Sequence, residues 1–408
     1  MTTLEGLRCT YAAAQALGLD LDMTRGKPSP EQLALSEPLL TLRNTHTTEG
    51  VDCRNYGGNL VGLAEARELF GNILGVSPSD VIVGGNSSLA LMHDIIVQAL
   101  LQGMHGEPWA LGHKPAFLCP VPGYDRHFAI CERYGIIMIP IPMDEHGPNM
   151  RMVLEQVQDP SVVGMWCVPK YSNPTGCTYS AKTVDHLAGM RPSNPRFRIF
   201  WDNAYAAHDL TDTHDVLSNI MESCRRYGTR DRAFIFGSTS KITFAGGGIA
   251  AVAMSERNRE WYLDGLRCQT IGHNKLNQLR HVLFFAKVEG GIRGHMARHR
   301  EILRPKFDTV EEALSTRLGD KPHIATWTRP RGGYFVSIEA PGCARRVVEL
   351  AASAGVKLTP EGATFPYGID PDDSNIRIAP SFPTVEEVRT AMEIVALCIE
   401  LAYAERTD

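Results

Sequence analysis

Short apolar runs alternate with helical patterns along the chain between about residues 60 and 255. The segments between the runs, such as residues 88–102, carry apolar side chains at the 3.6-residue period of a helix. This alternation predicts an α/β fold with a mostly parallel seven-stranded sheet that has helices on both faces. The seven predicted strands are residues 81–83, 116–119, 136–139, 162–168, 197–201, 233–236 and 249–253.

The pattern changes after Gly290-Gly291. Thr384-Val385-Glu386-Glu387 has the form of a capping box at the start of a terminal helix. We expect a large domain from residues 51–290, and a smaller α+β domain from residues 1–50 and 291–408. The other elements predicted for this part are a long helix at 295–318, a β-rich run at 333–338, a helix near 344–354 and a strand at 375–379.

The composition argues against several kinds of partner. A net charge of −5 over 408 residues is mild, so neither a nucleic acid nor a membrane is an expected partner. No segment reaches the roughly 20 apolar residues that a membrane helix needs, and the N-terminus does not resemble a secretion signal. The ten cysteines are scattered without a C-x-x-C pair, which favours buried, reduced thiols in a cytoplasmic protein.

One pair of histidines has the spacing of metal ligands on a helix. His295 and His299 are separated by three residues, but Met296 stands where a zinc hydrolase of this pattern has a glutamate. We interpret the two as surface histidines and expect no metal site.

Polar motifs follow three of the predicted strands. They are Asn173-Pro174-Thr175-Gly176, Asp202-Asn203-Ala204-Tyr205 and Ser238-Thr239-Ser240-Lys241. Because the carboxyl ends of parallel strands meet at one edge of a sheet, we expect these side chains to lie close together. They comprise an amine, a carboxylate, hydroxyls, an asparagine and a tyrosine, which are the groups needed to hold pyridoxal 5′-phosphate.

Through these motifs the chain resembles the aspartate aminotransferase superfamily, the pyridoxal-phosphate enzymes of fold type I. Residues 24–33 (TRGKPSPEQL), 201–205 (WDNAY) and 240–246 (SKITFAG) are similar to its divergent branch, called subgroup Ic. The resemblance extends from about residue 20 to the C-terminus. It implies a large and a small domain, pyridoxal 5′-phosphate as the cofactor, and a homodimer with shared active sites.

The resemblance implies a role for each motif. Lys241 would form a Schiff base with the cofactor and then act as the base that moves the substrate's Cα proton. Asp202 would pair with the protonated pyridine nitrogen, since a buried carboxylate needs a cation. Tyr205 and Asn173 would donate to the phenolate oxygen of the ring. Taken singly, Asp202 would more often be a helix cap, and Asn-Pro-Thr-Gly is an ordinary turn.

Two loops are candidates for binding the phosphate. The loop at residues 84–88 leads into the N-terminus of a helix, which is an anion site, and the loop at residues 238–241 supplies serine hydroxyls. An arginine usually follows the Schiff-base lysine in this superfamily, but Ile249 stands there, so we expect the helix dipole and an unassigned group to meet the charge. Gly246-Gly247-Gly248 is expected to let the backbone pass close to the cofactor. The predicted phosphate-binding residues are Asn86, Ser87, Ser88, Ser238 and Ser240.

Two tyrosines match aromatic positions of the superfamily. Tyr56, in Arg54-Asn55-Tyr56, matches a tyrosine that reaches the phosphate of the neighbouring subunit. Tyr124, in Pro122-Gly123-Tyr124, matches the ring that stacks on the pyridine face, although a tyrosine after Pro-Gly is otherwise a routine loop anchor.

An amino-acid substrate needs a cation for its α-carboxylate, and a guanidinium offers two parallel hydrogen bonds. Arg377 matches the carboxylate-binding arginine of the family, and the alternative is an outward residue on an edge strand. Gly26 matches a glycine whose backbone faces the same carboxylate. A dicarboxylic substrate needs a second cation. The candidates for this distal position are Arg25, Lys27, Lys275 and Arg331.

The stretch 270–275 corresponds to a loop that crosses the dimer interface in relatives. This favours Lys275, or the adjacent Asn274, for the distal carboxylate, but either residue could equally be a solvated loop residue.

The leading hypothesis is an aminotransferase that acts on aspartate or glutamate with 2-oxoglutarate. The same core residues also serve aminotransferases for aromatic or other amino acids and carbon–sulfur β-lyases, so these alternatives stay open. A third alternative is the sensing domain of a pyridoxal-phosphate-binding transcription regulator. It would need a basic helix-turn-helix ahead of Arg25, and no such pattern is present there.

Overall fold

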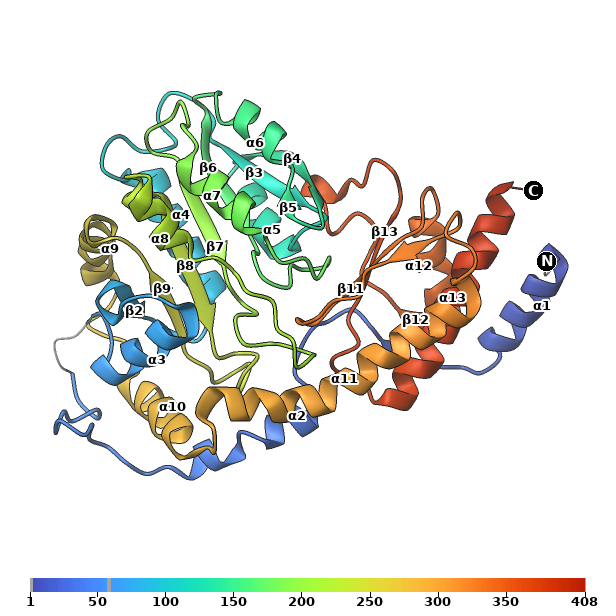
Figure 1. Ribbon diagram of the computed structural model, residues 1–408, viewed down its shortest axis with the longest axis horizontal. Coiled ribbons are helices and arrows are strands. Elements are labelled where there is room, and N and C mark those ends of the chain that lie inside the picture. Colours follow the sequence, from blue (N-terminus) through green and yellow to red (C-terminus); the bar gives the residue numbers. More distant parts are fainter. Residues whose placement is uncertain (1–2, 57–59, 408) are drawn as a thin grey trace.

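The computed structural model describes residues 3–56 and 60–407. Its main element is an eight-stranded sheet in the order β2-β9-β8-β7-β6-β3-β4-β5 (Figure 1). The pairs β3–β4, β3–β6, β6–β7 and β7–β8 are parallel, whereas β9 and β5 run antiparallel to their neighbours. The strands are β2 (Val81–Val83), β3 (Ala116–Val121), β4 (Ile137–Asp144), β5 (Gly147–Pro148), β6 (Val162–Cys167), β7 (Arg198–Asp202), β8 (Ala233–Ser238) and β9 (Ala250–Ala253).

All seven predicted strands are present, so the mostly parallel α/β sheet is confirmed. The predicted number of seven strands is wrong by one, because β5 pairs antiparallel with the end of β4. Its two residues, Gly147 and Pro148, are depleted in strands and gave no strand signal in the sequence.

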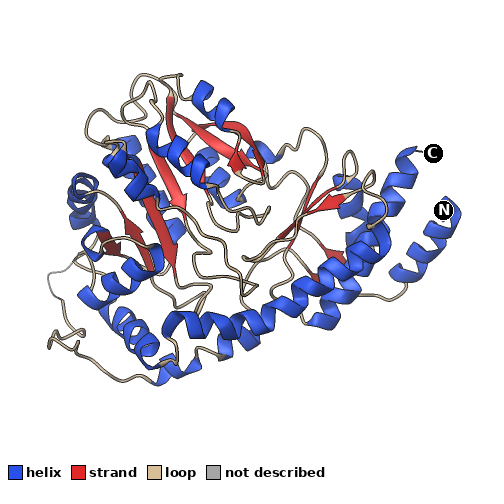
Figure 2. Cartoon of the chain, viewed as in Figure 1, coloured by secondary structure: helices blue, strands red, loops and turns tan. Residues whose placement is uncertain are grey.

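Helices cover both faces of this sheet, as the blue helices around the red strands of Figure 2 show. Successive residues of one strand enter opposite apolar clusters: Ile199 packs on one side of the sheet and Phe200 on the other. Burial on both faces explains why the strands are continuous apolar runs. The helices are α3 (Ala64–Leu74), α7 (Ala181–Gly189), α8 (Ile220–Arg226) and α10 (Lys275–Lys287) on the first side, and α4 (Ser88–Leu101), α5 (Asp125–Arg133) and α9 (Glu256–Gln269) on the second, with α6 (Met150–Gln156) after β5.

A second, smaller sheet is antiparallel, with the order β10-β11-β13. Its apolar cluster is shared with the first and last helices, and the terminal helix starts with the predicted capping box, since Thr384 and Glu387 exchange hydrogen bonds. The short β1 near the N-terminus pairs in parallel with β12. The elements are α1 (Leu4–Gln15), β1 (Leu21–Asp22), α2 (Pro30–Ala34), β10 (Thr326–Trp327), β11 (Val336–Glu339), α12 (Ala344–Ser353), β12 (Val356–Lys357), β13 (Asn375–Ile378) and α13 (Val385–Thr407).

Helix α11 (Gly291–Leu318) runs along both parts of the molecule (Figure 1). Met296 near its start packs with Ile242 and Phe284, whereas Leu303 and Leu314 belong to the cluster of the small sheet. The division into residues 51–290 and 1–50 plus 291–408 therefore stays a prediction, because this helix contacts both sides of the proposed boundary.

The interpretation of His295 and His299 as surface residues is wrong, because both side chains are fully buried. His299 Nδ1 lies 2.9 Å from Gln32 Nε2 of α2, and His295 Nε2 lies 2.8 Å from the carbonyl oxygen of Ile242. Burial lowers the pKa of His299 to about 3, so its imidazole is neutral. No group of three His, Cys, Asp or Glu side chains within residues 3–56 and 60–407 is arranged to hold a metal ion.

Two further expectations concern membranes and thiols. Among the described helices, none has the length and apolar character needed to cross a membrane. All ten cysteines are free thiols; seven of them are buried as expected, whereas Cys9 and Cys268 are exposed and Cys177 is half-buried.

Candidate active site

The site lies at the carboxyl ends of β6, β7 and β8, as the sequence predicted. Asp202 is the last residue of β7 and pairs in register with Phe236 of β8, and Lys241 follows β8 by three residues. Lys241 Nζ donates a hydrogen bond to the Tyr205 hydroxyl over 2.7 Å. The strand ends thus bring the predicted amine, carboxylate and phenol together.

The surroundings of Lys241 favour a reactive amine. Burial, the largest effect, lowers the pKa of its ammonium, although Tyr124 and Asp202 act in the opposite direction. A lowered pKa increases the fraction of neutral amine, which is the nucleophilic form. Burial also raises the pKa of Tyr205, so this phenol remains protonated and can donate a hydrogen bond.

Two residues that the sequence analysis missed hold the backbone of the lysine. The Lys241 carbonyl oxygen accepts from the Tyr334 hydroxyl at 3.1 Å and lies 3.2 Å from His208 Nε2. Burial lowers the pKa of His208 to about 3, so it is a neutral imidazole that donates through this nitrogen. Neither residue belongs to a recognisable motif, and Tyr334 is far away in the sequence.

Asp202 is buried and has only one of its two carboxylate oxygens satisfied. His127 Nε2 lies 3.1 Å from Oδ2, and the His127 ring stacks on Trp166 with centroids 4.2 Å apart. Oδ1 is buried with no hydrogen-bond partner among the described residues. A buried acceptor without a donor is costly, and the protonated ring nitrogen of pyridoxal phosphate is a donor that fits this position. His127 was also missed, although it lies one helical turn after Tyr124.

Tyr124 is half-buried beside the same group of residues. Its ring meets that of His127 edge-on, with centroids 4.9 Å apart, at the start of α5. Burial raises the pKa of Tyr124 to about 12. The tyrosine is thus a neutral ring near Asp202.

Asn173 is buried in the turn that follows β6. Within the turn, Gly176 N–H donates to the Ser172 carbonyl over 2.6 Å, and the Asn173 Oδ1 atom accepts from Arg377 Nη1 at 3.4 Å. Because Oδ1 accepts from the arginine, the amide nitrogen of Asn173 remains as the donor for a ring oxygen.

The two predicted phosphate loops touch each other. Ser240 Oγ donates to the Asn86 carbonyl at 2.9 Å, and Asn86 Nδ2 donates to the Gly246 carbonyl at 3.3 Å. Ser87 caps α4 by accepting from the Ala90 N–H. The remaining N–H groups of this first turn have no helical partner, which suits an anion. Ser88 is the first residue of α4, and Ser238 ends β8.

Ile249, eight residues after Lys241, lies in an apolar environment. Its side chain is buried in the apolar cluster with Ala251 and Ile235, and its N–H donates to Thr239 Oγ1. In the glycine run, a Cβ on Gly248 would lie 2.9 Å from the Ser240 nitrogen, whereas one on Gly246 would meet nothing within 4 Å. The close approach that requires a glycine is therefore between Gly248 and the chain next to Lys241.

Arg377 points into the site. Its side chain on β13 is 8% exposed, so the alternative of an outward residue on an edge strand is wrong. The guanidinium lies 5.1 Å from the centre of the Phe335 ring, and a Cβ on Gly26 would come within 2.5 Å of that ring. Gly26 thus lets the N-terminal segment pack against the aromatic ring beside Arg377.

The residues predicted to bind a distal substrate carboxylate have different surroundings. Arg331 forms an ion pair with Asp215, and Lys27 lies over the Phe382 ring, 3.8 Å from its centre. Arg25 is exposed. Lys275 donates to the Asp52 carbonyl at 3.2 Å, while Asn274 caps α10.

Tyr56 is 82% exposed, and its neighbours Gly57 and Gly58 lie outside the described residues. Among the described contacts, Lys275 bonds the Asp52 carbonyl and not a residue near Lys241, and the roles of Tyr56 and Lys275 stay predictions.

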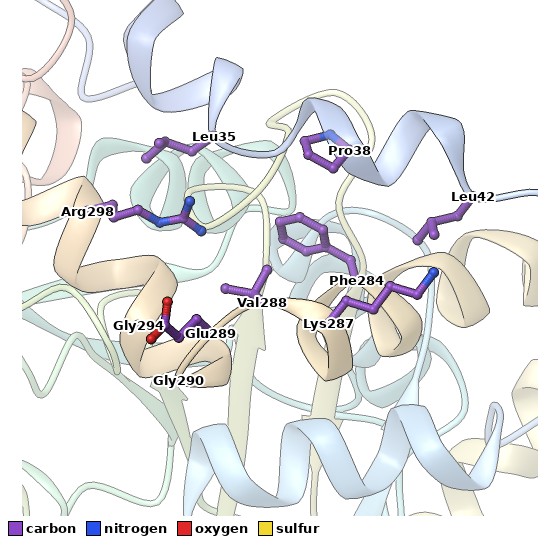
Figure 3. Close-up of a pocket in the computed structure, with 10 residues that line it drawn as sticks. All are labelled: Leu35, Pro38, Leu42, Phe284, Lys287, Val288, Glu289, Gly290, Gly294 and Arg298. Atoms are coloured by element: carbon purple, nitrogen blue, oxygen red, sulfur yellow. The ribbon is translucent and has the colours of Figure 1, made fainter.

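Two cavities lie outside this group of residues. One of about 1090 Å³ lies between the two sheets, beside Thr175 and Gly176 of the Asn173 turn and Ser337 of β11. The other, of about 580 Å³, lies where the segment around Pro38 crosses the junction of α10 and α11, with Phe284 and Arg298 in its wall (Figure 3). None of the predicted site residues lines the second cavity, and we assign no ligand to it.

Known proteins resemble the chain over its whole length. The aspartate amino-transferase family matches residues 2–408. A relative from Mycolicibacterium smegmatis is 47% identical over 407 residues, which are 97% of this chain and 94% of the relative. The aspartate aminotransferase of Corynebacterium glutamicum is 44% identical over 98% of this chain and 94% of its own length.

The fold of a solved relative agrees. The crystal structure of an aspartate transaminase from Corynebacterium glutamicum, 43% identical, superimposes with a TM-score of 0.96 over 99% of this chain and 96% of that one. The agreement covers both the eight-stranded sheet and the smaller sheet. The chain belongs to the aspartate amino-transferase family.

Proposed function

We propose that this aminotransferase is an aspartate aminotransferase that moves the amino group of aspartate to 2-oxoglutarate. The cofactor of its family is pyridoxal 5′-phosphate, which withdraws electrons from the substrate's Cα when it is bound. The observation that carries the proposal is the buried group of Lys241, Tyr205 and Asp202, in which Asp202 Oδ1 lacks a donor. The choice of aspartate as the substrate is supported by the 44% identical relative that is named for this substrate.

Each residue of the site has a task in this proposal. Lys241 is the point of attachment and the base that takes the Cα proton, and its lowered pKa suits both tasks. Asp202 would keep the nitrogen of the bound ring protonated, and His127 orients Asp202 through its contact with Oδ2. Tyr205 and Asn173 would donate to the phenolate oxygen of the bound ring. Arg377 binds the α-carboxylate of the substrate.

Residues around Tyr56 support a proposed homodimer. Val51, Tyr56 and Ile271 are apolar side chains with exposed fractions of 45%, 82% and 67%. The Lys275–Asp52 hydrogen bond joins the segments that carry them. Exposed apolar side chains in neighbouring segments are typical of a subunit interface. In a dimer, Tyr56 and Lys275 would then reach the active site of the other subunit.

A hybrid experiment tests this dimer. If Tyr56 acts in the opposite subunit, inactive Tyr56→Ala and Lys241→Ala chains should regain activity when they are mixed and refolded, because half of the mixed dimer's sites carry neither lesion. We expect the heterodimer to have one intact site out of two. A mixture of Lys241→Ala with Leu17→Ala, which alters an exposed apolar residue in the turn after α1, controls for activity from the unaltered partner chain. A wild-type protein that is active as a monomer in light scattering would contradict the proposal.

A panel of amino acids tests the substrate. Arg377→Leu should lower kcat/KM for every amino acid by about 10–100-fold, because it removes a charge-assisted pair of hydrogen bonds. Lys275→Ala should cause a loss of that size for aspartate and glutamate and spare alanine and phenylalanine. The conversion of the cofactor, followed by visible absorbance, measures each rate. If Lys275→Ala weakens all substrates equally, Arg25 is the next candidate, and if the wild type prefers a neutral amino acid, the aspartate proposal fails.

A further inference from the structure

Arg377 already has a carboxylate partner within its own chain. Its Nη1 atom lies 3.0 Å from Asp125 Oδ1, in an ion pair whose side chains are 8% and 33% exposed. Nη1 is also 3.4 Å from Asn173 Oδ1, and Nε donates to Thr359 Oγ1 at 3.4 Å. A bidentate carboxylate needs two neighbouring nitrogens of the guanidinium. A carboxylate that binds both Nη1 and Nη2 would therefore have to displace Asp125 from Nη1.

We infer that Asp125 competes with the substrate's α-carboxylate for Arg377 and so lowers the affinity of the protein for every carboxylate ligand. The inference rests on the proposed role of Arg377. Without a ligand, Asp125 neutralises a guanidinium that would otherwise be a buried, unpaired charge, which is strongly unfavourable. Once a ligand is bound, two carboxylates share one cation and repel each other.

Arg377 does not depend on Asp125 for its position. The guanidinium lies over the Phe335 ring, and Thr359 and Asn173 hold two of its nitrogens. Because these contacts come from other elements than α5, they remain when Asp125 is replaced. We therefore expect the arginine to stay in place in an Asp125 variant.

Asp125 is free to leave the ion pair. Among the described residues, no other side chain bonds its carboxylate, and one third of the side chain is exposed, so water can take over from Arg377. Asp125 is the first residue of α5, and its negative charge is also favourable there because the N-terminus of a helix is positive. The apparent affinity of a ligand falls in proportion to the fraction of protein that can bind it. A pair that is closed about 90% of the time would weaken carboxylate binding about tenfold.

The affinity of the holoenzyme for succinate tests the inference, because succinate has two carboxylates and no amino group to transfer. Isothermal titration calorimetry should give about tenfold tighter binding to Asp125→Asn than to the wild type. Asp125→Ala should shift the affinity in the same direction. Glu132→Gln is the matched control, since it removes the same charge from an exposed position on the same helix, and it should bind succinate like the wild type.

Two results distinguish a failure of this inference from a failure of the proposed role of Arg377. If both Asp125 variants bind succinate only as tightly as the wild type, Asp125 does not compete and the inference is overturned. Weaker binding by both variants would also overturn it, and would show that Asp125 positions Arg377. If Arg377→Leu binds succinate as tightly as the wild type, the proposed role of Arg377 fails whatever the Asp125 variants do. Kinetics give a second readout, since Asp125→Asn should lower the KM for aspartate without the same change in kcat.

Discussion

Replacing Lys241 by alanine should abolish transamination. A positioned general base alone contributes about 10²–10⁴ to the rate, and in the proposed function this lysine also attaches the cofactor, so we expect a loss of at least about 10⁴-fold. The physical reason is that no other amine bonds Tyr205 or lies beside Asp202 among the described residues. The initial rate with aspartate and 2-oxoglutarate measures the loss.

The attachment itself has a separate test. Borohydride reduction of the wild-type holoenzyme, followed by peptide mass spectrometry, should place the cofactor on Lys241. Lys182→Ala serves as the control, because this lysine is exposed on α7 and its loss should change neither the rate nor the label. A label on another lysine would refute the assignment, and a colourless protein that takes up no pyridoxal phosphate would refute the cofactor.

Replacing Asp202 by alanine should damage catalysis more than cofactor binding. In the proposed function the carboxylate stabilises the protonated ring nitrogen, and removing one preorganised charge of this kind typically costs about 10²–10³ in kcat. The substitution also leaves the His127 Nε2–H buried without its acceptor. We expect a fall in kcat of about 10²-fold or more with a smaller change in the dissociation constant of the cofactor, measured by titrating the apoenzyme.

Tyr205→Phe provides the comparison for this prediction. It removes the hydroxyl that bonds Lys241, but Asn173 can still donate to the same ring oxygen, so the loss should be smaller than for Asp202→Ala. An Asp202→Ala enzyme with wild-type turnover would show that the ring nitrogen does not depend on this carboxylate.

Local patterns in the sequence were sufficient to predict the strands and the core of the site. A strand that is buried on both faces must be apolar throughout, so all seven runs could be identified from composition and length. Asp202 ends one strand and Lys241 follows the adjacent parallel strand, and the geometry of a parallel sheet then brings them to one edge. The two-residue strand β5 could not be predicted in this way, because glycine and proline carry no strand signal.

Residues distant in the sequence supply the contacts that only the tertiary structure decided. The environment of a polar side chain depends on which other segments cover it, and no local pattern records this. His295 and His299 are buried because α2 and the lysine loop pack on α11, and His127 matters because its helix lies beside Asp202. The Arg377–Asp125 pair joins residues 252 positions apart. The sequence thus determined the fold and the chemical groups of the site, whereas tertiary packing decided the protonation state of the buried histidines and the partner of Arg377.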